Sequence, residues 1–350
     1  MSDPTGWAAP GGGPQWQPPP NGWPPPSGWQ PPMAPKPGVI PLRPLGVGEI
    51  LDGAISYIRA NPGVTLGLSA VVITLTQLIQ IPVQYLYVDS LANVTSSPAE
   101  PTLDEVADVI GGGLTSGVIG GFVTFIAVTL LTGMLIVVLA RAVVGRHATA
   151  AEAWAAVKPR LPGLLGVTFL TGLALGGCVL VGFLPLVLGA LADAPGGLIA
   201  ALGVVFIPLA LCVALWLGIS WSMVAPAYVL EGIPAMAAFG RSMRLVRGQW
   251  WRVFGILLLG AVISAAISVA VALPFSLAGG LLAGLSGAGD GAGSTLLVLV
   301  VSSIGAIVAS TITSPFSAGV TGLLYFDQRI RREALDIELA RAAAQPPPPW

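Results

Sequence analysis

The chain has 350 residues, of which 54% are hydrophobic and only 9% are charged, and its formal net charge is −1. Soluble domains carry about 25% charged residues, so this composition excludes a water-soluble fold for most of the chain. The apolar residues form runs longer than the ~20 residues that cross a bilayer. This pattern predicts an integral membrane protein with membrane lipids as partners, and we expect no nucleic-acid partner.

The N-terminal segment is rich in Pro, Gly, Trp and Gln, and the pair Gly-Trp recurs at 6–7, 22–23 and 28–29. Proline lacks a backbone donor and fixes φ, so such a segment favours extended chain over a folded domain. We expect residues 1–40 to be a disordered tail, which is a candidate for recruiting a protein partner. The segment lacks the cationic and short apolar regions of a secretory signal peptide, so we expect no cleavable signal.

Six apolar runs follow the tail and predict an all-α, polytopic transmembrane helix bundle over residues 41–326. Residues 327–350 are predicted to form a cytoplasmic amphipathic segment with a Pro-rich end. Prolines inside the last four runs predict kinks, tilts or partly re-entrant ends. The predicted spans are 63–87, 115–140, 163–191, 198–230, 253–285 and 294–326, and the prolines are Pro185, Pro208, Pro226, Pro274 and Pro315.

The charges are segregated along the chain. All 15 Lys and Arg residues precede the first span, follow the last one or lie on alternate connections, which is one side of a six-span bundle. The positive-inside rule places that side in the cytoplasm, so we expect both termini to be cytoplasmic. The other three connections carry acidic residues and no cation: Asp89, Glu100, Asp104, Glu105, Asp108, Asp193 and Asp290.

A threefold repeat organises the predicted spans. Each pair of spans follows a short segment with helical spacing, at 48–60, 148–160 and 234–247. In the first segment, apolar residues recur at helical spacing on one face and polar residues occupy the opposite face, as in a helix that lies in the headgroup plane. The sequence therefore predicts three copies of interfacial helix, span and span. A charged residue closes the second span of each copy: Arg141, Glu231 and Asp327.

Three glutamines, Gln77, Gln80 and Gln84, lie on one face of the first predicted span. Amide side chains inside a membrane need hydrogen-bond partners, and bonds between helices would supply them. The alternative is that this intramembrane polar face lines a translocation path.

Four arginines form a dense cationic cluster between the fourth and fifth spans: Arg241, Arg244, Arg247 and Arg252. Such a cluster orients the protein and attracts anionic lipid headgroups. The sharper hypothesis is a binding site for a lipid headgroup or phosphate, because arginine offers bidentate geometry to phosphate.

Other chemically active side chains predict no catalytic, metal or cofactor site. We expect Cys178 and Cys212 to be small buried hydrophobes and His147 to lie in a surface loop. Glycines spaced four residues apart predict close helix packing, inside the bundle or between protomers. They are Gly113 with Gly117, Gly172 with Gly176, and Gly280 with Gly284.

Three segments at the predicted cytoplasmic edge carry a family resemblance: PLRPLGVGEILDGAISYIRANPGV (41–64), VLEGIPAMAAFGRSMRLVRGQWWRVFG (229–255) and LLYFDQRIRREALDIEL (323–339). With them the chain resembles the bacterial glycerophosphoryl diester phosphodiesterase membrane-domain family from about residue 41 to 340. The resemblance implies a multi-pass protein of a bacterial plasma membrane. It does not imply phosphodiesterase activity, since that chemistry requires a metal site on a soluble domain and His147 is the sole histidine.

Two functions fit the sequence. The first is a non-enzymatic scaffold or accessory protein of the bacterial cell envelope, with the tail as recruiter and the bundle as anchor. The alternative is a transporter or lipid-handling protein for a neutral or lipidic substrate, which the repeats and the glutamine face favour. Ion-coupled carriers usually place ionisable groups at membrane depth, and the predicted spans have none. An intramembrane enzyme ranks lowest because acid–base catalysis needs titratable groups at a common site.

Overall fold

The computed structural model describes residues 38–95, 102–192, 194–285 and 292–335. Within these ranges the chain forms helices and no strand. Six helical stretches among the described residues are long and apolar enough to cross a membrane, which confirms the predicted all-α bundle of six spans. Residues 1–37 and 336–350, which hold most of the predicted tail and the Pro-rich end, lie outside the described residues.

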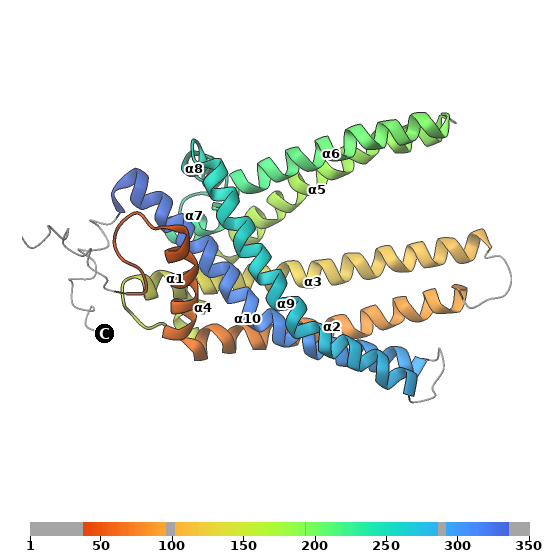
Figure 1. Cartoon of the computed structure of the whole chain (residues 1–350), viewed down its shortest axis with the longest axis horizontal. Helices are drawn as coiled ribbons and strands as arrows, with labels where there is room; N and C mark the ends of the chain where they lie inside the picture. Colours follow the sequence, from red (N-terminus) through yellow and green to blue (C-terminus); the bar gives the residue numbers. More distant parts are fainter. Residues whose placement is uncertain (1–37, 96–101, 193, 286–291, 336–350) are drawn as a thin grey trace, which may run out of the picture. The chain divides into compact units, whose positions relative to one another are not determined.

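The helices occur in three units of the predicted order, an interfacial helix followed by two spans (Figure 1). The first unit is α1 (Val47–Ala60), α2 (Pro62–Thr95) and α3 (Leu103–Val143). The second is α4 (Ala150–Val157), a 3-10 turn (Lys158–Arg160), α5 (Leu161–Leu191), α6 (Gly196–Ser220) and α7 (Val224–Glu231). The third is α8 (Ala235–Val246), α9 (Trp250–Leu285) and α10 (Ala292–Glu333).

Capping hydrogen bonds mark the first residues of the interfacial helices α4 and α1. At α4 the Thr149 hydroxyl accepts from the Glu152 amide at 3.2 Å while Glu152 accepts from the Thr149 amide at 2.9 Å, a reciprocal capping box. At α1 the Glu49 carboxylate accepts from the Gly46 amide at 2.7 Å. Helix α1 then buries one apolar face, which includes Ile50, Ala54 and Tyr57. The amphipathic pattern in the sequence therefore corresponds to a real buried face.

Each unit folds its two spans into a hairpin, and the second spans of all three units contact one another. Figure 1 shows α1, α4, α7 and α8 gathered at one end of the long helices. We call this the cationic end, because the described Lys and Arg residues all lie there. The main hydrophobic core is at this end and includes Met134, Leu139, Val143, Ala227, Val229, Leu323, Leu324 and Tyr325.

The hairpin of α5 and α6 buries little of its surface. In α5 the buried residues are Leu164, Val167 and Gly182, and in α6 they are Gly203, Ile219 and Ser220. Apolar side chains cover the rest of these helices, as expected for surfaces that face lipid. Cys178 and Cys212 follow this pattern, being half-buried and exposed. The expectation that both are buried is wrong, because apolar residues of a span need no burial within the chain.

The fourth predicted span is not continuous. Helix α6 ends at Ser220 and α7 begins at Val224, so the backbone between them needs other hydrogen-bond partners. The buried Ser242 of α8 supplies two, since its hydroxyl donates to the Ser220 carbonyl at 2.8 Å and accepts from the Met223 amide at 3.2 Å. The run of apolar residues from 198 to 230 carried no signal for this break.

The last two spans are single uninterrupted helices, although Pro274 and Pro315 lie inside them. The described parts of α9 and α10 therefore hold no re-entrant segment. With 42 residues, α10 is roughly 63 Å long, about twice the thickness of a hydrocarbon core. It continues past the predicted span end at 326 to Glu333, and these last turns carry the ionic contacts described below.

The substitution Ser242→Ala should destabilise the protein because it leaves the Ser220 carbonyl and the Met223 amide without their partner. We expect a loss of about 1–3 kcal/mol, measured as a lower midpoint of thermal unfolding in detergent. Ser276→Ala is the matched control, since the Ser276 hydroxyl is exposed and bonds only within its own helix. An unchanged midpoint for Ser242→Ala would show that the break does not depend on α8.

Candidate functional site

The charged residues that close the three units contact the start of another unit. Arg141 forms an ion pair with Glu152 of α4 at 2.6 Å, and Glu231 with Arg241 of α8 at 2.9 Å. The Asp327 carboxylate accepts from the amide of Leu45, two residues before α1, at 2.8 Å. The third unit is thus bonded back to the first, and the three units close into a ring at the cationic end.

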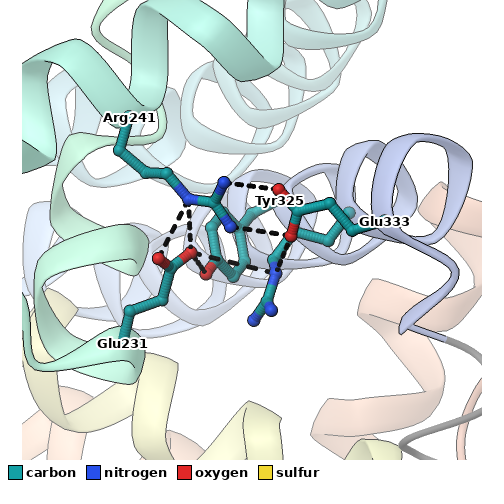
Figure 2. Close-up of polar contacts among 5 residues, drawn as sticks. Glu231, Arg241, Tyr325 and Glu333 are labelled. Atoms are coloured by element: carbon teal, nitrogen blue, oxygen red, sulfur yellow. Dashed lines mark hydrogen bonds and ion pairs between the residues drawn. The ribbon is translucent and has the colours of Figure 1, made fainter.

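A cluster around Glu231 joins α7, α8 and α10 (Figure 2). The Nε of Arg241 donates to both Glu231 oxygens, and its terminal nitrogens donate to both oxygens of Glu333, with Nη2 at 2.7 Å. Tyr325 donates its hydroxyl proton to Glu231. Arg329 donates to Glu333 at 2.9 Å and lies over the Tyr325 ring, 5.9 Å from its centroid.

The Glu231 cluster contains two carboxylates and two guanidinium groups, so its formal charges cancel. Its charged side chains are only 15–27% exposed, which strengthens their mutual attraction over that of a surface pair. The hydrogen bonds with Glu333 raise the pKa of Arg241 above its ordinary value, and Glu231 adds to this shift. Arg241 is therefore committed to holding helices together, and it has little capacity left for a ligand.

A second cluster surrounds Asp327, whose side chain is fully buried. A buried carboxylate requires charged and hydrogen-bonding partners, and Asp327 has Arg252, Arg331 at 2.9 Å and the Leu45 amide. The same two arginines donate to the Leu45 carbonyl, at 2.7 and 2.8 Å. The backbone of Leu45 is clamped on both sides, so the segment before α1 is fixed to α9 and α10.

The structure divides the four predicted arginines into two pairs. Arg241 and Arg252 are bound to carboxylates, as described above. Arg244 and Arg247 are exposed, and neither has a carboxylate partner among the described residues. The sequence placed all four in one cluster. Glu231 lies only ten residues from Arg241, but the partners Glu333 and Asp327 lie on α10, 92 residues from Arg241 and 75 residues from Arg252.

Arg244 and Arg247 line one pocket of about 420 Å³, which we call the Arg244 pocket. The left-handed turn at Gly248, with φ of 81°, lets the chain reverse between Arg247 and α9. Trp250 then donates its indole N–H to the Trp216 carbonyl at 3.4 Å, which ties α9 to α6. The lining comprises Trp216, Ser220, Met243, Arg244, Val246, Arg247, Gly248 and Trp250.

The three predicted glutamines differ in their hydrogen bonds and in whether they line a groove. Gln80 donates its amide to the Thr124 hydroxyl at 2.6 Å and to the Gly120 carbonyl at 3.4 Å, so it joins α2 to α3 as the packing interpretation expects. Gln84 lies 3.5 Å from Gln80, and both line a groove of about 770 Å³. Gln77 is half-buried, does not line this groove and has no hydrogen bond within the described part of the chain.

Two other predictions concern surface loops and glycines. His147 is exposed, and its Nδ1 lies 2.9 Å from the Asn61 amide oxygen, a contact that ties the α3–α4 loop to the start of α2.

Gly113 packs on Tyr87, as its spacing predicts, since a Cβ there would lie 2.9 Å from the ring. The five other paired glycines have open space around them, so they do not pack helices inside this chain: Gly117, Gly172, Gly176, Gly280 and Gly284.

A family model described as a domain of unknown function, DUF7847, matches residues 45–327. The match begins at Leu45 and ends at Asp327, the two residues whose hydrogen bond closes the ring of units. No curated protein and no solved structure matches the chain. The resemblance to the glycerophosphoryl diester phosphodiesterase membrane-domain family stays a prediction.

Asp327→Ala should be strongly destabilising, because it leaves two guanidinium groups and the Leu45 amide without their shared partner. Removing one member of a buried ion pair costs about 3–5 kcal/mol. We expect a markedly lower midpoint of thermal unfolding in detergent. Arg43→Ala is the control, since it breaks only an exposed pair with Glu49, worth about 0–1 kcal/mol. Equal midpoints for the two variants would refute a structural role for Asp327.

Proposed function

The chain belongs to the DUF7847 family, and from this premise we propose a non-enzymatic accessory protein of a bacterial plasma membrane that binds anionic lipid headgroups in the Arg244 pocket. One observation carries the proposal. Arg241, Arg252, Arg329 and Arg331 all have carboxylate partners, whereas Arg244 and Arg247 beside them have none among the described residues. Their charge is available to a ligand.

The chemistry of the Arg244 pocket suits a phospholipid. Two guanidinium groups supply several N–H donors in a planar geometry that matches phosphate oxygens. Met243, which is exposed, adds apolar surface for the glycerol and upper acyl region. Trp216 and Trp250 complete the lining, and tryptophan is enriched where membrane and water meet. The combination of cations, indoles and apolar contacts favours an amphiphile over free phosphate.

The position of the pocket supports the same ligand. It lies where α9 begins, next to Trp251, a residue that is 77% exposed. In the proposed orientation the cationic end faces the cytoplasm, as the positive-inside rule requires. Each Arg near the surface of an anionic leaflet contributes about 1 kcal/mol of attraction, and a defined pocket adds specific contacts to this background.

A structural role for the remaining charges supports a non-enzymatic protein. Glu231, Asp327 and Glu333 each contact at least one arginine. A carboxylate held in this way is occupied by a guanidinium group, so it is not free to exchange a proton with a substrate. The closed ring instead gives a fixed base for the tail before residue 38, which we propose as the segment that recruits a protein partner in the cytoplasm. Residues 39 and 40 belong to the base and not to the tail, since the Val39 amide donates to the Ala142 carbonyl and Ile40 is fully buried.

The double variant Arg244→Gln, Arg247→Gln tests the proposal in vesicles of phosphatidylglycerol and phosphatidylethanolamine. After detergent extraction we measure by native mass spectrometry how much phosphatidylglycerol stays bound. Each charge-assisted contact is worth about 1.5–3 kcal/mol, so we expect retention to fall at least tenfold.

Arg59→Gln with Lys158→Gln is the matched control, because it removes the same charge from two exposed residues at the same end. It should retain phosphatidylglycerol like the unmodified protein. Equal losses in both double variants would mean that the lipid responds to net charge alone, and the Arg244 pocket would then not be a binding site.

A further inference from the structure

The groove of about 770 Å³ runs along α2 and α3, and Thr168 of α5 closes part of it. Gln80 lies roughly 27 Å along α2 from Pro62, and Thr129 lies roughly 21 Å along α3 from Val143. The other end of the lining, Gly113, lies roughly 45 Å along α3 from Val143. A hydrocarbon core is about 30 Å thick, so the groove runs from the half of the core far from the cationic end to the opposite membrane surface. It is therefore separate from the Arg244 pocket.

Thr129 gives the groove an unsatisfied polar group. The residue is 3% exposed, and its buried hydroxyl oxygen has no hydrogen-bond partner. Threonines in a helix usually bond the carbonyl four residues before, as Thr168 does at 2.9 Å in the same groove. A buried hydroxyl without a partner costs about 1–3 kcal/mol. A ligand with an oxygen atom near Thr129 would recover this free energy.

Glycines shape the groove in two different ways. A Cβ at Gly113 or Gly120 would lie 2.9 Å from Tyr87 or Gln80, so these glycines let α2 approach α3. A Cβ at Gly117 or Gly121 would meet nothing within 4 Å. Packing of α2 on α3 does not require these last two glycines, and their missing side chains leave room for a ligand.

The lining selects the charge of the ligand. Among the described residues the lining contains the polar groups of Gln80, Gln84 and Thr124 but no Asp, Glu, Lys, Arg or His. A charged group at the level of Thr129 or Gln80 would have no countercharge among the described residues, at a cost of several kcal/mol. A saturated chain alone would leave Thr129 unsatisfied. The remaining class is an uncharged amphiphile with oxygen atoms, and the volume falls in the ~300–1,000 Å³ range of small-molecule sites.

We propose that this groove binds an uncharged lipid of the diacylglycerol type, with its hydroxyl and ester oxygens at Thr129 and at the pair Gln80 and Gln84. Its glycerol end lies over Gly117 and Gly121, toward the far membrane surface, and its acyl chains point toward the middle of the membrane. This site is independent of the Arg244 pocket in its position, in its lining and in the charge of its ligand.

A neighbouring cavity extends the same chemistry. Val128 lines both the groove and a second cavity of about 310 Å³, at the place where α3, the α6–α7 break and α10 meet. The cavity is lined by all three units and is rich in neutral hydroxyls: Thr132, Ser222, Thr313, Ser314, Ser317 and Thr321.

Photolabelling tests the proposal with the full chain in nanodiscs of phosphatidylglycerol and phosphatidylethanolamine. The probe is a diacylglycerol that carries a diazirine on one acyl chain, and mass spectrometry locates and quantifies the label. We expect label on α3 between 113 and 129. Gly121→Leu should reduce it at least fivefold, because the leucine fills open space. Gly172→Leu, at an exposed and equally open glycine of α5, should leave it unchanged.

Thr129→Val separates a ligand role from a structural one, since valine keeps the shape and removes the hydroxyl. We expect at least a threefold loss of label in a protein that is no less stable than the unmodified one. Unchanged label in this variant would overturn the role of Thr129. Equal labelling of the groove by a diazirine phosphatidylcholine would overturn the selectivity for an uncharged lipid and would indicate ordinary annular lipid.

Discussion

The architecture depends on one buried carboxylate, Asp327, near the end of the last span. It binds Arg252 at the start of α9, Arg331 one turn further along α10 and the Leu45 amide ahead of α1. A charge with no solvent exposure is tolerated only with partners of this kind, so its contacts hold three segments in one arrangement. The bond to Leu45 joins the end of the third unit to the start of the first, and the family match spans the same two residues.

The other two units close in a related way, through Arg141 with Glu152 and Glu231 with Arg241. This network also decides which cations remain available. Arginines that hold the ring are neutralised by carboxylates, while Arg244 and Arg247 stand outside it and line a pocket with two tryptophans. The cationic end thus combines a fixed base with the pocket proposed for an anionic headgroup. The far half of the bundle holds the groove proposed for an uncharged lipid, so the two proposed sites differ in position and in the charge of their ligand.

Hydropathy and charge segregation were sufficient to predict the six spans and the three repeats, because both patterns are local and strong. They were not sufficient for the break at 221–223, since the serine that stabilises it lies on α8. The sequence also did not predict which of the four arginines bind carboxylates, because Arg241 and Glu333 are 92 residues apart. Gln80 forms the hydrogen bond between helices that the sequence predicted. The position of Gln77 on the same face of the helix was not enough to predict that it lies outside the groove. Contacts between units carry information that no single span contains.

Hydrogen exchange at residues 39–46 is the most direct measurement of the closed ring. The Leu45 amide donates to a fully buried carboxylate, so its exchange in detergent should be slow. The account predicts that Asp327→Ala makes this segment exchange rapidly while the middle of α9 stays protected. Rapid exchange of the segment in the unmodified protein would contradict the ring, and so would unchanged protection in the variant.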